Sequence, residues 1–176
     1  MHTPFAWRHI VRAALVAMVI SSPALAQLVP PAPQRVDLSG PRFGFTVLSD
    51  GIVRKLETTA RISVSPVVSQ FGWQFEKQFF DRRQSGPTAI TEGVVLVGGL
   101  EQGVALPSFS WLTGIRTRNG AEFGVGPNVT PVGVALAVAA GRSFRAGVVN
   151  VPVNVAVVKS RSGVRVSALT GFSLWR

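Results

Sequence analysis

The sequence contains no cysteine and no tyrosine, and its two histidines, His2 and His9, lie close to the N-terminus. Without cysteine, disulfides, thiolate catalysis and Cys-ligated zinc sites are excluded. Both histidines lie within the expected signal peptide, residues 1–26, so its cleavage would exclude Ser-His-Asp catalysis as well. A Ser-Lys pair would depend on Lys55, Lys77 or Lys159, and none has a recognisable spacing to a serine. We therefore expect a protein that is not an enzyme and that uses no metal or other cofactor.

Acidic residues are also scarce, with 8 Asp and Glu against 18 Lys and Arg, a formal net charge of +10. Neither a basic-aromatic strand motif nor a basic helical stripe is present, so nucleic acid is not an expected partner. In an exported protein a basic surplus suits anionic lipid head groups. Arg82, Arg83, Arg142 and Arg145 lie at expected strand ends. They are candidate head-group contacts, and a solvated rim is the alternative.

No apolar run reaches the roughly 20 residues of a membrane-spanning helix. A shorter run over residues 13–20 follows the basic residues Arg8, His9 and Arg12 and precedes an Ala-Leu-Ala sequence at 24–26. This order predicts a secretory signal peptide over residues 1–26, cleaved after Ala26, rather than an anchor. Cleavage leaves a formal charge of +8. Four prolines within 27–41 predict an extended leader, and residues 42–176 then form one domain.

Alternation with a period of two dominates residues 42–176, as where Val149, Val151 and Val153 alternate with polar or small residues. This period predicts strands. Eight are expected, at about 42–48, 67–80, 89–98, 106–117, 121–126, 132–144, 149–158 and 163–175. Short connections favour an all-β, eight-stranded, antiparallel up-and-down (meander) barrel. One short helix at 50–58, capped by Ser49 or Asp50, is expected between the first two strands. It packs on the domain, or acts as a plug or a membrane-surface helix.

The two faces of these strands differ in size more than in charge. Val134, Leu136 and Val138 alternate with glycine and alanine, whereas the wet face of an ordinary soluble sheet carries Lys, Glu and Thr. Small and polar faces fit the inside of a narrow barrel, and the bulky faces then contact lipid. The opposite assignment, a soluble periplasmic β-domain with valine and phenylalanine in its core, is the alternative. The expected fifth strand is shorter than the roughly 9–11 residues that cross a bilayer.

Four charged residues share the small, polar faces, namely Glu76, Arg116, Glu122 and Arg165. We expect them to form an interior polar network in which the arginines neutralise the carboxylates, because buried charges need partners. The alternative is a carboxylate pair for acid–base or glycosidic chemistry, drawn from Glu76, Glu92 and Glu122. The orientation of Glu92 is left open, since it shares the parity of apolar neighbours and a bulge would reverse it.

The turn after the fourth strand makes a sharper prediction. A two-residue turn at 119–120 would pair Arg116 with Phe123, which sets a charge beside an apolar ring. A three-residue loop over 118–120 pairs Arg116 with Glu122 and Ile115 with Phe123 instead. This loop requires a left-handed backbone at Gly120, which glycine adopts without steric cost. The pattern favours the three-residue loop.

The signal peptide, the meander and the last strand together support a family resemblance. That strand reads Val164-x-Val166-x-Ala168-x-Thr170-x-Phe172, and the chain ends Leu174-Trp175-Arg176 rather than on a terminal phenylalanine. Residues 41–175 resemble the small outer-membrane β-barrel proteins of Gram-negative bacteria. The resemblance implies insertion into the outer membrane by the barrel-insertion machinery and contact with outer-membrane lipids. It transfers no catalytic residue, because such barrels serve many unrelated functions.

Two functions are consistent with these patterns. The first is a non-enzymatic integral outer-membrane barrel with a plugged polar interior and a structural or interaction role in the cell envelope. The alternative is a soluble periplasmic β-barrel module that binds a lipid or another apolar ligand between its bulky faces. The sequence identifies no protein partner for either one.

Overall fold

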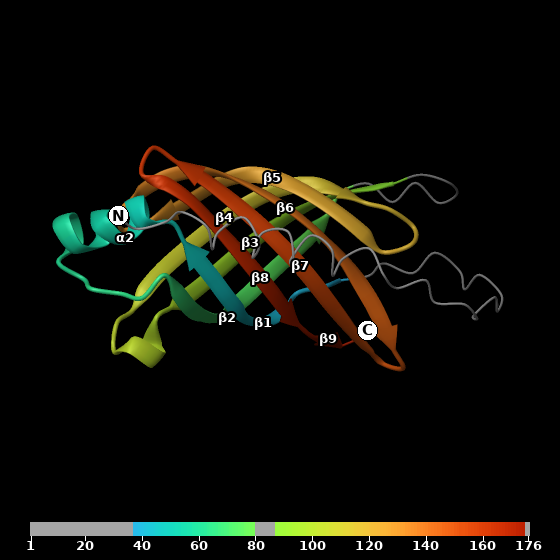
Figure 1. Cartoon of the computed structure of the whole chain (residues 1–176). Coiled ribbons are helices and arrows are strands. Elements are labelled where there is room, and N and C mark those ends of the chain that lie inside the picture. The colour runs from blue at the N-terminus through green and yellow to red at the C-terminus, as the bar shows by residue number, and fades with distance from the viewer. Residues whose placement is uncertain (1–36, 80–86, 175–176) are drawn as a thin grey trace, which may run out of the picture. The chain divides into compact units, whose positions relative to one another are not determined.

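The structure, a computed structural model, describes residues 37–79 and 87–174. The expected signal peptide, residues 27–36 of the leader and the Arg82-Arg83 pair lie outside the described residues. The expected fold class is confirmed, since eight antiparallel strands form a closed meander barrel with one short helix between the first two (Figure 1).

The barrel strands follow one another in chain order. They are β1 (Gly40–Leu48), β2 (Val67–Gln78), β3 (Thr88–Gly98), β4 (Leu106–Arg116), β5 (Ala121–Thr130), β6 (Gly133–Ala146), β7 (Val149–Ser160) and β8 (Gly163–Gly171). Each pairs with its sequence neighbour, and β1 pairs with β8 to close the barrel. A short β9 (Ser173–Leu174) pairs with β7 in the register that β8 already has, so it continues the last strand. Pro152 of β7, which has no backbone N–H, lies beside the break.

The fifth strand differs from its prediction. The sequence predicts that it ends at Gly126, yet β5 continues to Thr130 and is 10 residues long. In a sequence, a glycine followed by a proline indicates the end of a strand. In the structure, however, Pro127 pairs with Leu136 of β6. The ladder on the β4 side skips Gly126 and Pro127. One intact neighbour therefore carries the strand past the proline.

The register predicted for the β4–β5 hairpin is confirmed. Arg116 lies opposite Glu122, and Ile115 lies opposite Phe123. The loop closes with Thr117, whose backbone N–H donates to Ala121 O at 2.8 Å. Gly120 has a φ of 78°, the left-handed conformation that this loop requires.

The side chain of Glu92 points into the barrel. Strands β2 and β3 pair without a bulge from Gln70 to Gln78, and Glu92 lies opposite Glu76. Glu92 is 6% exposed, and its neighbours Ile90 and Val94 on the same face are buried as well. This whole face of β3 therefore points into the barrel.

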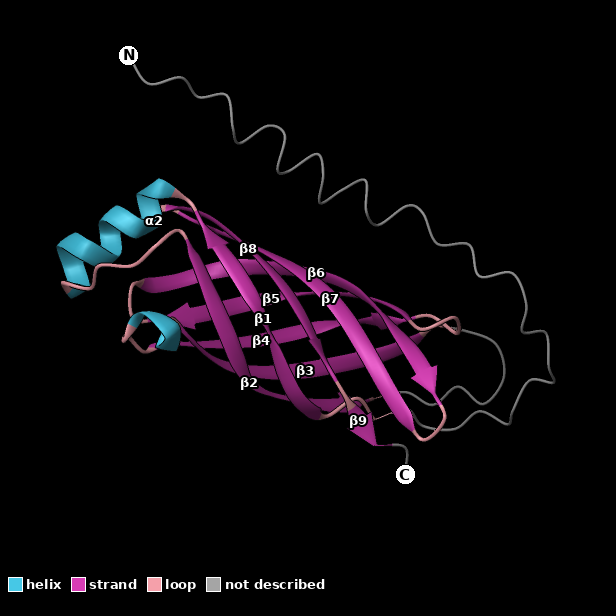
Figure 2. Cartoon of the chain, turned by 60° about the horizontal axis from the view of Figure 1, so that its bottom comes forward, coloured by secondary structure: helices cyan, strands magenta, loops and turns pink. Residues whose placement is uncertain are grey.

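The helix lies at the end of the barrel where β1 finishes, called here the helix-bearing end (Figure 2). It comprises α2 (Asp50–Lys55) and a π-helical continuation, η1 (Leu56–Ala60). Ile52 and Leu56 are buried in a cluster that also contains Leu48, Val64 and Val68. Because Leu106 and Val132 pack against this cluster, the helical segment contacts several strands around that end.

The expected side-chain cap of the helix is wrong. Ser49 precedes α2 but makes no side-chain capping bond. Its hydroxyl oxygen instead accepts the backbone N–H of Val164 at 3.0 Å. Ser49 thus joins the start of the helix to β8, which fixes the helix against the barrel.

Residues 37–39 were expected to belong to the extended leader, but they pack onto the opposite end of the barrel. Leu38 is fully buried, and its carbonyl oxygen accepts a hydrogen bond from Arg42 Nη2 at 2.5 Å. The hydroxyl of Ser39 accepts the backbone N–H of Glu76 at 2.8 Å. The last part of the leader therefore belongs structurally to the barrel.

The connection between β3 and β4 contains a 3-10 helix, η2 (Leu100–Gln102), at the helix-bearing end. Glu101 accepts hydrogen bonds from the hydroxyl and from the backbone N–H of Ser69, the latter at 2.8 Å. These bonds favour the carboxylate and lower the pKa of Glu101 to about 2. The contact joins the β3–β4 connection to β2.

This contact predicts a pH dependence. The folded pKa of Glu101 is depressed below the free value of about 4.3. Its contribution to folding is therefore fully present above that value and is lost as the pH falls towards about 2. An NMR titration of the Glu101 carboxyl should give a midpoint near that pKa. In Ser69→Ala the midpoint should rise part of the way to the free value, because the backbone donor remains. An unchanged midpoint in this variant would contradict the assignment.

Candidate functional site

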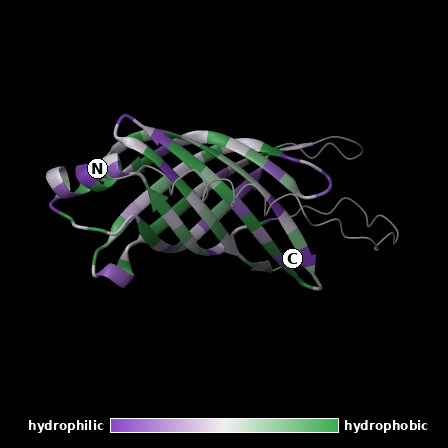
Figure 3. Cartoon of the chain, viewed as in Figure 1, coloured by the Kyte–Doolittle hydropathy of each residue, from purple (hydrophilic) through white to green (hydrophobic). Residues whose placement is uncertain are grey.

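The bulky faces of the strands lie on the outside of the barrel. Phe45 is 54% exposed, Trp111 is 51% exposed and Val134 is 69% exposed, whereas Ala137 on the other face of β6 is 1% exposed. Figure 3 shows the corresponding alternation of hydrophobic and hydrophilic residues along the strands. The orientation predicted from the size of the two faces is therefore confirmed.

Within the strands of the part of the chain that the structure describes, charged residues are confined to inward positions and to the strand ends. On outward positions of the strands the charged residues are Lys77, Arg142 and Lys159. Lys77 and Lys159 are each one residue from the end of their strand. Arg142 lies opposite Ala121, where β5 begins. A belt without charge surrounds the middle of the barrel.

Inside the barrel, one set of polar side chains centres on Arg116 of β4. Its Nε donates to Glu122 Oε1 at 2.9 Å, and its Nη1 donates to Glu76 Oε1 at 2.6 Å. Arg116 Nη2 donates to the second oxygen of Glu76, so that this pair is bidentate. Ser143 of β6 adds a hydroxyl donor to Glu122 at 2.9 Å. Both carboxylates are almost fully buried and are neutralised by the same guanidinium.

A second set lies beside the first and centres on Gln74 of β2. Arg42 Nε donates to Gln74 Oε1 at 3.0 Å, and Gln74 Nε2 donates to Glu92 Oε1 at 2.8 Å. Arg42 is 1% exposed and also donates to the carbonyl oxygens of Leu38 and Pro41. With the first set it forms an interior network with members on β1, β2, β3, β4, β5 and β6.

This arrangement suits neutralisation of charge and mechanical linkage of strands. Glu76 has both oxygens engaged by Arg116, and its side chain is 1% exposed. A carboxylate whose two oxygens are both bound by a guanidinium is held in place as an ion-pair partner. Apart from the bond from Arg42 to Pro41 within β1, the hydrogen bonds of the network described above join two strands or a strand and the segment before β1, which favours a rigid, filled interior.

Arg165 does not join this network as expected. Its Nη2 donates to Asn128 Oδ1 at 2.5 Å, and within the described residues it forms no ion pair. Arg165 lies opposite Leu48 of β1, at the helix-bearing end, and this position separates it from the network. Arg116 lies opposite Thr88, the first residue of β3, at the other end of the barrel. Two residues that both point into the barrel can therefore lie at different positions along the barrel axis.

Of the four candidate head-group contacts, two lie within the described residues. The guanidinium of Arg142 packs over the ring of Phe144, 5.6 Å from its centroid. Arg145 is exposed, and its Nε donates to Gly147 O at 3.3 Å in the β6–β7 turn. Both side chains lie at the end opposite the helix.

Sequence reasoning missed Arg42, Gln74 and Ser143 as members of the network. Arg42 and Gln74 each alternate with outward aromatic residues, Phe43 and Trp73, so the parity rule that selected Arg116 also selects them. Their partners were not predictable, because the pairing of Arg42 with Gln74 depends on the β1–β2 register.

The described residues contain no cluster of His, Cys, Asp or Glu arranged to hold a metal ion. Over residues 37–79 and 87–174, no helix has the length and apolar character needed to cross a membrane. Comparison with protein-family models, curated proteins and solved structures finds no match to this chain.

The network predicts strong coupling between its members. Arg116→Met should lower the free energy of unfolding by about 3–5 kcal/mol, because it leaves two buried carboxylates without their cation. Combining it with Glu122→Gln should cost less than the sum of the two single changes. Urea unfolding in detergent, followed by tryptophan fluorescence, measures all three variants. Arg161→Gln in the exposed β7–β8 turn is the control and should change stability by at most about 0.5 kcal/mol. Additive effects would refute the coupling.

Proposed function

We propose that this protein is a non-enzymatic, integral outer-membrane β-barrel with a plugged interior and a structural or interaction role in the cell envelope. One observation carries the proposal. The outer surface of the barrel is a continuous belt of large apolar side chains from every strand, and the charges lie inside it or at its edges.

Such a large exposed apolar belt is unfavourable in water. Monomeric soluble proteins rarely expose contiguous apolar patches beyond a few hundred Å². Here aromatic residues such as Phe71, Trp73 and Phe75 are each exposed on successive outward positions of β2 alone. A bilayer accepts this surface, because lipid-facing positions of membrane barrels are apolar and their lumen-facing positions are polar.

Strand length supports the same proposal. A tilted strand needs about 9–11 residues to cross the hydrocarbon core. The eight barrel strands are 9 to 14 residues long. The sequence had set β5 apart as too short, and its observed length of 10 residues removes that objection.

Three further features favour a barrel that does not conduct solutes. The Arg–Glu network fills one part of the interior, the α2–η1 segment packs at the helix-bearing end, and Leu38 is buried near the other end. An eight-stranded barrel is narrow enough for side chains alone to fill it. The proposed role therefore depends on the outer surface and the exposed ends of the barrel, and not on transport through it.

The longest connection between the strands, residues 49–66, carries the helix. Outer-membrane barrels have short periplasmic turns and longer loops on the cell exterior. We therefore assign the helix-bearing end to the cell surface. The alternative function, an apolar ligand held between the bulky faces, has no support in this geometry because those faces point away from the interior.

Location and orientation can be tested with single cysteines, since the chain has none of its own. Expressed in a Gram-negative host, the protein should fractionate with outer membranes, require detergent and migrate faster unheated than boiled. Glu57→Cys on η1 should react with a membrane-impermeant maleimide in intact cells. Asn119→Cys in the β4–β5 turn is the matched control and should react only after the outer membrane is permeabilised. Release by osmotic shock without detergent would contradict the proposal, and the reverse labelling pattern would invert the orientation.

The belt itself predicts a depth-dependent penalty. Val138 lies in the middle of β6, between Val125 and Val157 of the flanking strands. Val138→Arg should lower stability in lipid by about 2–4 kcal/mol, whereas Phe144→Arg near the strand end should cost about 0–1 kcal/mol. Urea titration in liposomes measures both variants. Equal, small effects would indicate that the middle of the barrel faces water.

A further inference from the structure

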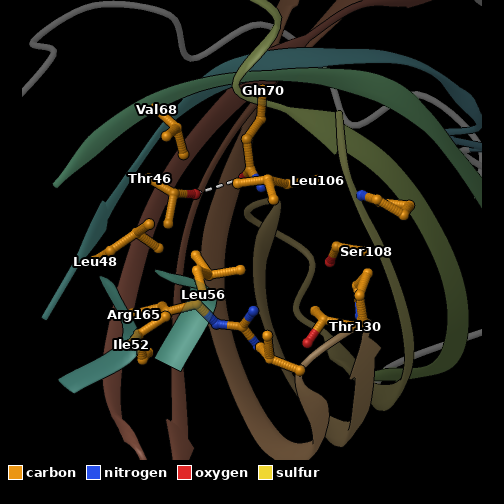
Figure 4. Close-up of a pocket in the computed structure, with 13 residues that line it drawn as sticks. Thr46, Leu48, Ile52, Leu56, Val68, Gln70, Leu106, Ser108, Thr130 and Arg165 are labelled. Atoms are coloured by element: carbon orange, nitrogen blue, oxygen red, sulfur yellow. Dashed lines mark hydrogen bonds between the residues drawn. The ribbon is translucent and has the colours of Figure 1, made fainter. Parts of the chain in front are cut away.

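Beneath the helix, the barrel contains a partly open cavity of about 40 Å³. Ile52 and Leu56 form part of its apolar side, together with side chains of the cluster at the helix-bearing end. Its polar side is made by Thr46, Gln70, Ser108, Thr130 and Arg165. Figure 4 shows Arg165 and Ser108 directed into the same space from facing parts of the wall.

The guanidinium of Arg165 is held in place by a chain of side-chain hydrogen bonds. Asn128 Nδ2 donates to the hydroxyls of Ser108 and Ser110 at 3.0 and 2.8 Å. These two bonds turn the amide so that Asn128 Oδ1 faces Arg165 and accepts its Nη2. The orientation of the arginine is thus set by the barrel wall, and most of its five N–H donors are left for other partners.

The lining of the cavity is mostly apolar, but two neutral hydrogen-bond donors lie beside Arg165. The hydroxyl of Ser108 accepts from Asn128 and so retains its own proton to donate. Gln70 uses its oxygen to accept from Thr46, which leaves its amide nitrogen available as a donor. With Arg165, these groups supply one positive charge and two neutral donors to a small space.

No described carboxylate forms an ion pair with Arg165. The inward acids Glu76, Glu92 and Glu122 belong to the network at the other end of the barrel. A partly buried guanidinium without a counter-charge is unfavourable, and an apolar cover strengthens its attraction for an anion. The positive charge of Arg165 and the neutral donors both favour an anion as the ligand.

We propose that this cavity binds a small inorganic anion of halide size, chloride being the test case, with Arg165 as its counter-charge and Ser108 and Gln70 as further donors. The volume agrees with such a ligand, since a single ordered water needs roughly 10–15 Å³. A lipid chain or a sugar phosphate would not fit in this space. The site does not depend on where the barrel resides in the cell.

The test uses the full-length protein in detergent and in gluconate buffer, which supplies no small anion. Titrated chloride should show excess ³⁵Cl NMR line broadening with the wild-type protein. Replacing gluconate with chloride at constant ionic strength should also raise the urea midpoint of unfolding. Urea is required because guanidinium chloride would itself supply the ligand.

Arg165→Gln should abolish both the excess broadening and the chloride-dependent shift. Arg161→Gln, an exposed neighbour at the same end of the barrel, should retain both. No excess broadening in the wild type, or equal broadening in Arg165→Gln, would overturn the proposal and leave a cavity that holds water only.

A milder pair of variants covers the case in which Arg165→Gln does not fold. Ser108→Ala should raise the chloride concentration for half-maximal broadening about tenfold, because it removes one donor to the anion. Ser110→Ala is the matched control, since Ser110 accepts the same Asn128 amide but does not line the cavity. Equal effects of the two changes would assign them to Asn128 rather than to the anion and would refute the role of Ser108.

Discussion

The closure of eight strands around a narrow interior is the constraint on which the rest of this structure depends. An inward position must be filled by a small side chain, by an apolar side chain that packs against its neighbours, or by a polar one whose groups find partners. The glycines of the inner faces show how tight this space is. A Cβ atom at Gly72 would meet the carbonyl oxygen of Val95 on the next strand, and one at Gly114 would meet that of Phe123. Most of the large aromatic side chains therefore point outward, and the apolar belt follows from the closure of the barrel.

The same constraint explains how the interior is filled. The acids Glu76 and Glu122 would be costly inside a narrow barrel if Arg116 did not lie between them. The two ends are filled by different means, with an apolar helical segment at one and the buried Leu38 near the other. Arg165 is the exception, since it is an inward charge near the helix without an acid beside it. The proposed anion would remove that exception by completing the balance of charge.

Local patterns predicted the fold well because each strand is set largely by its own alternation. The strand count, the meander and the β4–β5 register depend on neighbours only a few residues apart, and the left-handed Gly120 follows from that register. The prediction was wrong where a distant strand overrides a local signal. β5 passes through Gly126 and Pro127 because β6 pairs with it there, and Ser49 bonds β8 rather than capping its own helix. Residues 37–39 pack on the barrel because Arg42 binds the carbonyl oxygen of Leu38.

The sequence by itself determined which side chains face inward, because side chains alternate across a strand whatever the strand is paired with. It therefore identified Glu76, Arg116, Glu122 and Arg165 as interior residues. The β4–β5 turn also predicted the Arg116–Glu122 pair. Only the tertiary structure decided that Glu76 joins this pair and that Arg165 does not, since the height of an inward residue along the barrel axis depends on strand tilt and on the stagger of the whole barrel. That stagger brings Arg116 between two carboxylates and sets Arg165 at the other end, beside a cavity beneath the helix.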